Sequence, residues 1–169
     1  INDLNDQAPY FERQVYRVSI NYKSSIGEIV TKVKAIDTDS EPYSNLIYNI
    51  AMIELYKNNQ PTSVRPIPSP FNLTNDGFVL TSQLMTQYPI DSRFVLFIEA
   101  REKVAPHRTA QTKVNVWLYD FTKLVKMTVK FSPEEVDLKR EEIEQTLSNV
   151  TSYIAIISDI KYHVDHKTG

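Results

Sequence analysis

The alternation of apolar and polar residues along residues 10–120 constrains the fold more than any other feature of this sequence. The segments 93–102 and 112–120 place apolar residues at every second position, as half-buried β-strands do. Other apolar or β-branched runs occur at 15–20, 27–37, 45–51 and 71–81, the last broken by a turn at Asn75-Asp76-Gly77. We therefore predict about seven short antiparallel strands in a mostly β, Greek-key (Ig-like) β-sandwich. The expected inward residues are Tyr16, Val18, Ile20, Phe94, Leu96, Ile98, Ala100, Val114, Val116 and Leu118.

One stretch of this region, residues 52–71, lacks a clear period. It holds four of the nine prolines in the chain. We predict a long surface loop that is partly extended, and a proline-rich recognition peptide is the alternative.

The pattern changes after Asp120. Residues 123–131 alternate as a half-buried strand, residues 132–150 have the pattern of a helix, and residues 152–165 have that of a second strand. Ser132 suits the N-cap, Pro133 the first helical position and Glu135 the capping-box position. The predicted apolar stripe of the helix consists of Val136, Ile143, Leu147 and Val150. A β-α-β unit of about 49 residues cannot bury a core alone, so it docks on the sandwich or belongs to a larger domain.

A docking face for this unit is suggested by the outward positions of the last two strands of the sandwich. These positions carry Val95, Phe97, Trp117 and Tyr119, which is less polar than a solvated sheet face should be. Apolar residues scattered on the surface are the alternative explanation. If the docking prediction holds, Trp117 is buried against residues beyond 121.

Composition argues against most enzymatic chemistry. The chain has no cysteine, which excludes disulfides, zinc–thiolate sites and thiol catalysis. Three glycines leave no phosphate-binding loop, and the net charge of −2 implies no affinity for nucleic acid. Of the three histidines, His163 and His166 lie three residues apart, on opposite faces of a strand. We therefore expect no enzymatic activity.

Oxygen ligands are concentrated at the start of the chain and recur further along it. Asp3, Asn5 and Asp6 precede the first strand, Asp37 and Asp39 end the segment 27–37, and Glu102 ends the segment 93–102. In a Greek-key sandwich these strand ends can meet where the N-terminal segment enters. Hard oxygen ligands without His or Cys favour calcium over zinc.

The segments that carry these oxygens resemble the cadherin family. "DLNDQAPYF" looks like the cadherin interdomain linker, Asp-x-Asn-Asp-Asn followed by a spacer and Pro-x-Phe. "VTKVKAIDTD" is similar to the second cadherin strand with its Asp-x-Asp motif. "LFIEARE" resembles the Leu-x-Val-x-Ala-x-Asp strand, with Glu102 where Asp is usual. The three motifs follow the expected order over residues 1–120, which implies a linker at 1–8, a cadherin repeat at 9–120 and a further domain at 121–169.

The resemblance also implies roles for individual residues. Side chains of Asp3, Asn5, Asp6, Asp37, Asp39 and Glu102 would ligate Ca²⁺, while Leu4 and Gln7 would offer backbone carbonyls. A backbone oxygen near Asn45 is a further candidate, although the loop spacing departs from the family pattern. Some ligands of a cadherin linker come from the preceding repeat, so binding by this chain alone should be weak.

The ligands that a cadherin repeat offers to the next linker are missing here. Tyr22 stands where the family has Glu, and Met85, Thr86 and Gln87 stand where it has Asp-Arg-Glu. "DFTKLV" lacks the Asn-Asp pair of a following linker. We therefore expect a calcium-free C-terminal junction, as in the last repeat of an array.

Residues 121–169 resemble the first half of the ferredoxin-like, membrane-adjacent domain that follows the last repeat in some long cadherins. Those of the hair-cell tip link, which act in mechanotransduction, and insect midgut cadherins that act as toxin receptors carry such tails. The resemblance implies calcium-dependent cell adhesion by the extracellular part of a single-pass plasma-membrane protein. Its partners would be other cadherin ectodomains, homophilic or heterophilic, with a parallel homodimer through the membrane-adjacent region. A ligand- or toxin-binding module is the alternative function. The sequons at Asn72 and Asn149 would be glycosylation sites of such an extracellular glycoprotein.

Overall fold

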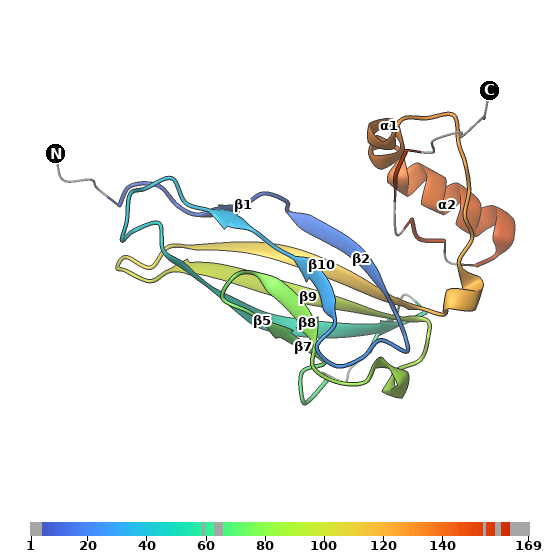
Figure 1. Cartoon of the computed structure of the whole chain (residues 1–169), viewed down its shortest axis with the longest axis horizontal. Helices are drawn as coiled ribbons and strands as arrows, with labels where there is room; N and C mark the ends of the chain where they lie inside the picture. Colours follow the sequence, from blue (N-terminus) through green and yellow to red (C-terminus); the bar gives the residue numbers. More distant parts are fainter. Residues whose placement is uncertain (1–4, 59, 63–65, 154, 158–159, 163–169) are drawn as a thin grey trace, which may run out of the picture. The chain divides into compact units, whose positions relative to one another are not determined.

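The computed structural model describes residues 5–58, 60–62, 66–153, 155–157 and 160–162. The chain divides into two compact units, residues 1–124 and 125–169 (Figure 1).

The first unit is the predicted β-sandwich. Its larger sheet has the strand order β2-β10-β9-β5-β6, and a three-stranded sheet has the order β3-β8-β7. Strands β1 and β4 pair in a separate two-stranded antiparallel sheet after the N-terminal segment. The bounds are β1 Tyr10–Phe11, β2 Val15–Asn21, β3 Ile29–Lys32, β4 Ala35–Ile36, β5 Leu46–Lys57, β6 Gln60–Pro61, β7 Phe71–Leu73, β8 Phe78–Thr81, β9 Ser92–Glu102 and β10 Thr109–Tyr119.

The core of this unit lies between the two main sheets and matches the predicted alternation. All the inward residues expected on β9 and β10 are buried, and Tyr16 and Ile20 are buried beside them while Val18 is half-buried. Phe94 lies at the centre, with the rings of Phe71 and Tyr88 packed edge-on against it. The predicted mostly β fold class and its β-sandwich are therefore confirmed.

One pairing differs from the purely antiparallel expectation. Strand β2 runs parallel to β10, from Val15 opposite Lys113 to Asn21 opposite Tyr119. The alternation of side chains is the same in parallel and antiparallel strands, so the sequence could not reveal this direction.

The prediction of a loop over residues 52–71 was wrong in its first part, because β5 continues to Lys57. A bulge explains the error. The register shifts between Ile50, opposite Ile98, and Met52, opposite Phe97, so the inward positions change from even to odd numbers. Ile53 and Leu55 are buried beyond this shift, and the interrupted alternation concealed the strand.

A glycine fixes the turn between β7 and β8. Gly77 has a φ of +83°, and a Cβ atom there would lie 2.1 Å from the carbonyl oxygen of Val33. Its own carbonyl accepts a hydrogen bond of 2.9 Å from the N–H of Val33. The turn predicted at Asn75-Asp76-Gly77 is therefore confirmed, and it packs directly on the backbone after β3.

The described residues of the second unit form two helices, α1 (Pro133–Leu138) and α2 (Arg140–Thr151). The predicted N-terminus is confirmed, since Ser132 and Glu135 form a reciprocal capping box and Pro133 begins the helix. The expected single helix is divided at Lys139, whose backbone leaves the helical region at φ −98° and ψ 10°. The predicted apolar stripe is only partly buried, because Val136 is buried whereas Val150 is 79% exposed.

The strand predicted at 123–131 is not formed. The six residues 124–129 have no regular secondary structure, and Val125, Met127 and Phe131 are exposed. The described residues of 152–165 contain no strand either, and the remainder of that segment, with His163, lies outside the described residues. A strand requires a hydrogen-bonded neighbour, and the described part of this unit offers none.

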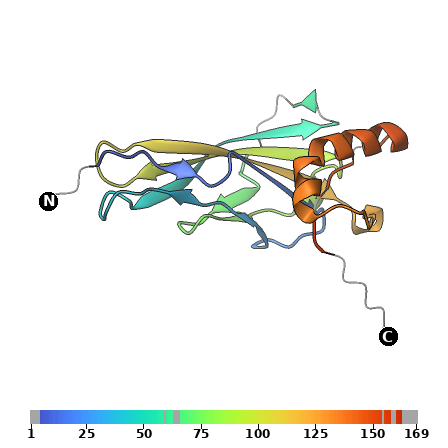
Figure 2. The ribbon, with the colours of Figure 1, turned by 90° about the horizontal axis from the view of Figure 1, so that it is seen from above.

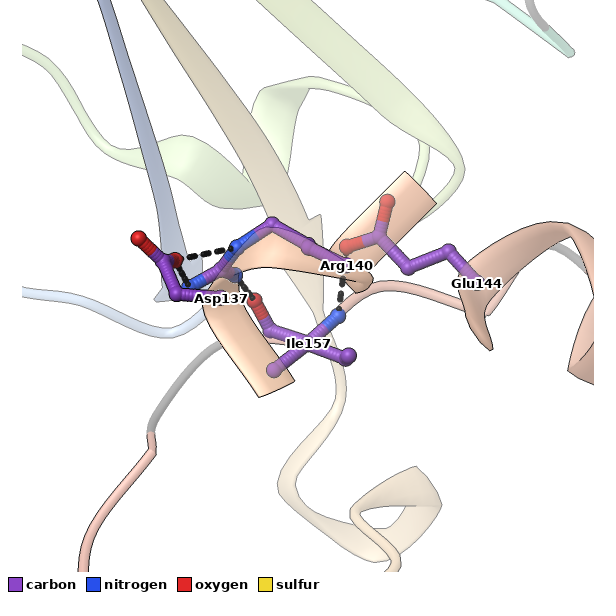
Figure 3. Close-up of polar contacts among 4 residues, drawn as sticks. All are labelled: Asp137, Arg140, Glu144 and Ile157. Carbon is purple, nitrogen blue, oxygen red and sulfur yellow. Dashed lines mark hydrogen bonds and ion pairs between the residues drawn. The ribbon is translucent and has the colours of Figure 1, made fainter. Parts of the chain in front are cut away.

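Polar side chains of α2 take the place of that neighbour (Figure 3). Glu144 Oε1 accepts a hydrogen bond of 2.9 Å from the N–H of Ile157, and Arg140 Nη1 donates one of 2.6 Å to its carbonyl. Arg140 also forms an ion pair of 2.8 Å with Asp137 across the break between the helices. Ser148 Oγ accepts from the N–H of Ala155 at 2.9 Å. The backbone of 155–157 is thus bonded to a helix face.

In the part of the chain that the structure describes, neither helix is long and apolar enough to cross a membrane.

Candidate cation site

Three segments that are distant in the sequence meet at one end of the sandwich. They are the N-terminal segment, the loop after β4 and the hairpin between β9 and β10, and both views place them side by side (Figures 1 and 2). The N–H of Gln7 donates to Asp39 at 3.2 Å, and Asn5 Nδ2 donates to Glu102 at 2.9 Å. The fold therefore brings together residues that the sequence analysis selected separately.

Glu102 is the most deeply buried residue of this group, with no exposed surface. Its Oε2 atom accepts two hydrogen bonds, from Asn5 Nδ2 and from the N–H of Arg108 at 3.1 Å. Its Oε1 atom is buried and has no hydrogen-bond partner among the described residues. Glu102 is the last residue of β9. It occupies one of the inward positions of that strand, at the end of the sandwich where the N-terminal segment lies.

The two aspartates of the Asp-x-Asp motif are linked through the backbone. The N–H of Asp39 donates to Asp37 Oδ1 at 3.1 Å, which fixes the turn that follows β4. Asp39 is itself buried and accepts from the N–H of Gln7. The other oxygen of Asp37, Oδ2, is buried without a hydrogen-bond partner in the described chain.

The other predicted ligands are less closely assembled. Asp3 and Leu4 lie outside the described residues. Asp6 is exposed and accepts a hydrogen bond of 3.0 Å from the side chain of Gln7. The carbonyl of Asn45 accepts from the N–H of Lys103 at 2.9 Å. Among the described residues, no three acidic or histidine side chains form a ready-made metal-binding group.

The chemistry of the site nevertheless suits a hard cation. Leaving a carboxylate oxygen buried without a partner costs free energy, and the site contains two such atoms, on Asp37 and Glu102. A calcium ion would neutralise both carboxylates and accept their oxygens as ligands. Asp37, Glu102 and the neighbouring Asp39 are the residues that would hold it, with Asn5 and Gln7 from the N-terminal segment.

Sequence reasoning missed one residue of this site, Arg108. It ends the β9–β10 hairpin loop, and its Nη1 atom donates to Asn5 Oδ1 at 2.6 Å and to the carbonyl of Gln7 at 2.8 Å. A signal could have been found, because Arg108 follows Glu102 by six residues across a hairpin and therefore lies near it. Because arginine is positively charged, as a metal cation is, its residue type alone does not indicate membership of a cation site.

The predicted docking residues lie on the outer face of the five-stranded sheet. Val95 is buried, and Phe97, Trp117 and Tyr119 are half-buried. Cations of the same sheet cover two of the rings. Arg17 and Arg93 lie 5.1 and 5.8 Å from the centre of Trp117, and Lys113 lies 5.1 Å from that of Phe97. Docking of the second unit on this face stays a prediction.

Both predicted glycosylation sites are accessible. Asn72 is exposed on β7, an edge strand of the three-stranded sheet, and Asn149 is exposed on α2. Thr74 and Thr151, the third residues of the two sequons, have hydroxyls that are hydrogen-bonded within the chain. Modification at these positions stays a prediction.

Comparison with known proteins gives a consistent result. A family model described as the Cadherin-23 alpha/beta domain matches residues 94–169. The chain is 37% identical over 164 residues to Cadherin-87A of Drosophila melanogaster, covering 96% of this chain and 8% of that protein. It is 27% identical over 168 residues to human Cadherin-23, covering 99% of this chain and 5% of that protein.

Solved structures show the same fold over 70% of the chain. The mouse Cadherin-23 EC22-24 structure superposes with a TM-score of 0.55 at 24% identity, covering 70% of this chain and 35% of that one. The Protocadherin Gamma B2 structure of extracellular cadherin domains 1-5 gives a TM-score of 0.59 at 23% identity, covering 70% and 21%. Segments that resemble cadherin motifs meet at one end of the sandwich, and the 37% identity over 96% of the chain shows the family. The chain belongs to the cadherin superfamily.

Proposed function

We propose that this chain is a membrane-proximal structural part of a long, calcium-dependent adhesion ectodomain. The observation that carries the proposal is the pair of buried, unpartnered carboxylate oxygens on Asp37 and Glu102 at the tip where the N-terminal segment enters. Calcium is proposed to bind there and to stiffen the junction with a preceding repeat. Because the chain spans 8% of Cadherin-87A and 5% of Cadherin-23, adhesion itself is proposed for the longer protein.

The opposite end of the sandwich supports a junction without calcium. Met85, which stands where the family has an acidic residue, is fully buried in the core. Tyr22 donates its N–H to the carbonyl of Tyr119 at 2.9 Å, and the ammonium of Lys23 lies 5.3 Å from the centre of its ring. A lysine therefore lies beside the position where a calcium ligand would be expected.

The remaining features follow from the same proposal. The second unit would belong to a ferredoxin-like domain next to the membrane of a single-pass plasma-membrane protein, and could form a parallel homodimer. Other cadherin ectodomains would be the adhesion partners, and mechanotransduction would be the role of a long ectodomain of this kind. Asn72 and Asn149 would carry glycans. A ligand- or toxin-binding receptor module is the second candidate, favoured by the edge strands and by the proline-rich sequence of residues 52–71.

Stiffening by calcium is testable by small-angle X-ray scattering on this chain joined at its N-terminus to a calcium-binding cadherin repeat, as the proposal requires. We expect calcium to lengthen and narrow the distribution of interatomic distances. Asp37→Asn should abolish the change, whereas Asp91→Asn, an exposed turn residue distant from the site, should preserve it. Identical scattering with calcium and with EDTA in the unsubstituted protein would refute the proposal.

A further inference from the structure

One basic side chain lies among the predicted calcium ligands. A single atom of it, Arg108 Nη1, donates hydrogen bonds to Asn5 Oδ1 at 2.6 Å and to the carbonyl oxygen of Gln7 at 2.8 Å. Both oxygens belong to the segment that the resemblance assigns to calcium binding. A positive charge from the chain itself therefore already holds the two linker oxygens together.

The backbone fixes Arg108 in this position. Its carbonyl accepts a hydrogen bond of 3.0 Å from the N–H of Glu102, and its own N–H donates to Glu102 Oε2 at 3.1 Å. The next residue, Thr109, begins β10 and lies opposite Arg101 of β9 in the antiparallel pair. The backbone position of Arg108 is thus fixed by hydrogen bonds at the base of the hairpin.

The oxygens of the site fall into two groups, those that are hydrogen-bonded to the Arg108 guanidinium and those that have no hydrogen-bond partner among the described residues. Arg108 donates hydrogen bonds to the amide oxygen of Asn5 and the carbonyl oxygen of Gln7. It donates none to the unpartnered oxygens, Asp37 Oδ2 and Glu102 Oε1. An oxygen that accepts a short bond from a guanidinium is less available to a metal, and a fixed positive charge near a divalent cation raises its energy.

We infer that Arg108 takes the place of a cation at the linker side of this junction. It keeps residues 5–7 attached to the sandwich when calcium is absent, and it competes with calcium for Asn5 Oδ1 and the Gln7 carbonyl. The inference rests on the proposed calcium site. It makes Arg108 the residue that sets how strongly this junction depends on calcium.

The test compares Arg108→Gln with the unsubstituted chain. Glutamine removes the charge and cannot reach both oxygens. Arg101→Gln, on the exposed face of the same hairpin, is the matched control for the change in net charge. Two quantities are measured by NMR: hydrogen-exchange protection of the Gln7 amide in EDTA, and the midpoint of a calcium titration.

We expect Arg108→Gln to lower protection of the Gln7 amide in EDTA by about tenfold or more, and to tighten calcium binding by about tenfold, because repulsion from one nearby charge is lost. Arg101→Gln should change neither quantity by more than about twofold. Unchanged protection in EDTA, or calcium binding that weakens in Arg108→Gln, would overturn the inference. If no protein binds calcium, the proposed calcium site fails, while the EDTA measurement still decides whether Arg108 holds the linker.

Discussion

Glu102 offers the sharpest test of how this end of the sandwich works. Replacing it with glutamine preserves its shape and its bonds from Asn5 and Arg108, removes the negative charge, and puts a neutral NH₂ group at the position of the unpartnered carboxylate oxygen. A buried, unsatisfied neutral group costs about 1–3 kcal/mol and an uncompensated buried charge costs more, so the carboxylate is destabilising relative to the amide unless a cation neutralises it. In EDTA, Glu102→Gln should therefore be as stable as the unsubstituted chain, or more stable by about 1 kcal/mol.

Calcium should reverse this ranking. With a dissociation constant of about 1 mM, typical of weak extracellular sites, about 10 mM calcium stabilises a protein by about 1.4 kcal/mol. The unsubstituted chain should gain this increment and Glu102→Gln should not. Glu99→Gln, on the same strand but the opposite face, is the matched control and should retain the full increment.

The assay is urea unfolding with and without calcium, followed by tryptophan fluorescence. Trp117 is the only tryptophan in the sequence and lies on β10, so the signal reports on the sandwich. The reasoning is refuted if Glu102→Gln lowers stability in EDTA by more than about 1 kcal/mol while keeping the calcium increment. That outcome would make Glu102 a structural anchor rather than a ligand.

Three further predictions concern parts of the fold outside the site. Gly77→Ala should lower the free energy of unfolding by about 2 kcal/mol or more, because its Cβ would clash with the Val33 carbonyl. Gly27→Ala, at a position with open space around it, should lower it by only about 1 kcal/mol. Urea unfolding measures both values. Burial raises the pKa of Tyr88 above its usual value, so its contribution to stability is complete below about pH 10 and is lost as pH rises through the raised pKa; Tyr88→Phe should flatten this alkaline slope. Glu144→Ala should remove the acceptor of the Ile157 amide and increase the hydrogen-exchange rate of that amide tenfold or more, which corresponds to about 1.4 kcal/mol of lost protection. Replacing the exposed Glu142 with alanine is the control and should leave that rate unchanged.

Much of the sandwich was predictable because burial on one face leaves a period of two in the sequence. The alternation on β9 and β10 identified the core residues correctly, and the turn before β8 was visible in its Asn-Asp-Gly signal. The bulge after Ile50 was not visible, because one extra residue in β5 converts a regular pattern into an apparently irregular one. The parallel direction of β2 was also hidden, since it depends on the path of the chain rather than on side-chain period.

The candidate site was predictable in its acidic residues and not in its basic one. Asp37, Asp39 and Glu102 fall at strand ends that topology brings together, so their grouping follows from the fold. The role of Arg108 depends on the geometry of one hairpin and on which oxygens its guanidinium reaches.

In the second unit, the helix cap was encoded locally and was predicted correctly. The flanking strands were expected from alternation alone, yet a strand needs a partner that alternation cannot supply. The buried face of α2 centres on Glu144, which forms a hydrogen bond to the backbone of Ile157. An apolar stripe therefore described this helix incompletely.

We propose that the tip formed by Asp37, Asp39 and Glu102 binds calcium together with the N-terminal segment. The most direct measurement is a calcium titration of this chain followed by the NMR signal of the Gln7 amide, which bonds to Asp39. We predict a saturable shift with a midpoint of about 1 mM or above, abolished by Asp37→Asn and unchanged by Asp91→Asn. A Gln7 signal that does not respond to calcium, or that responds equally in Asp37→Asn, would show that this tip is not the calcium site.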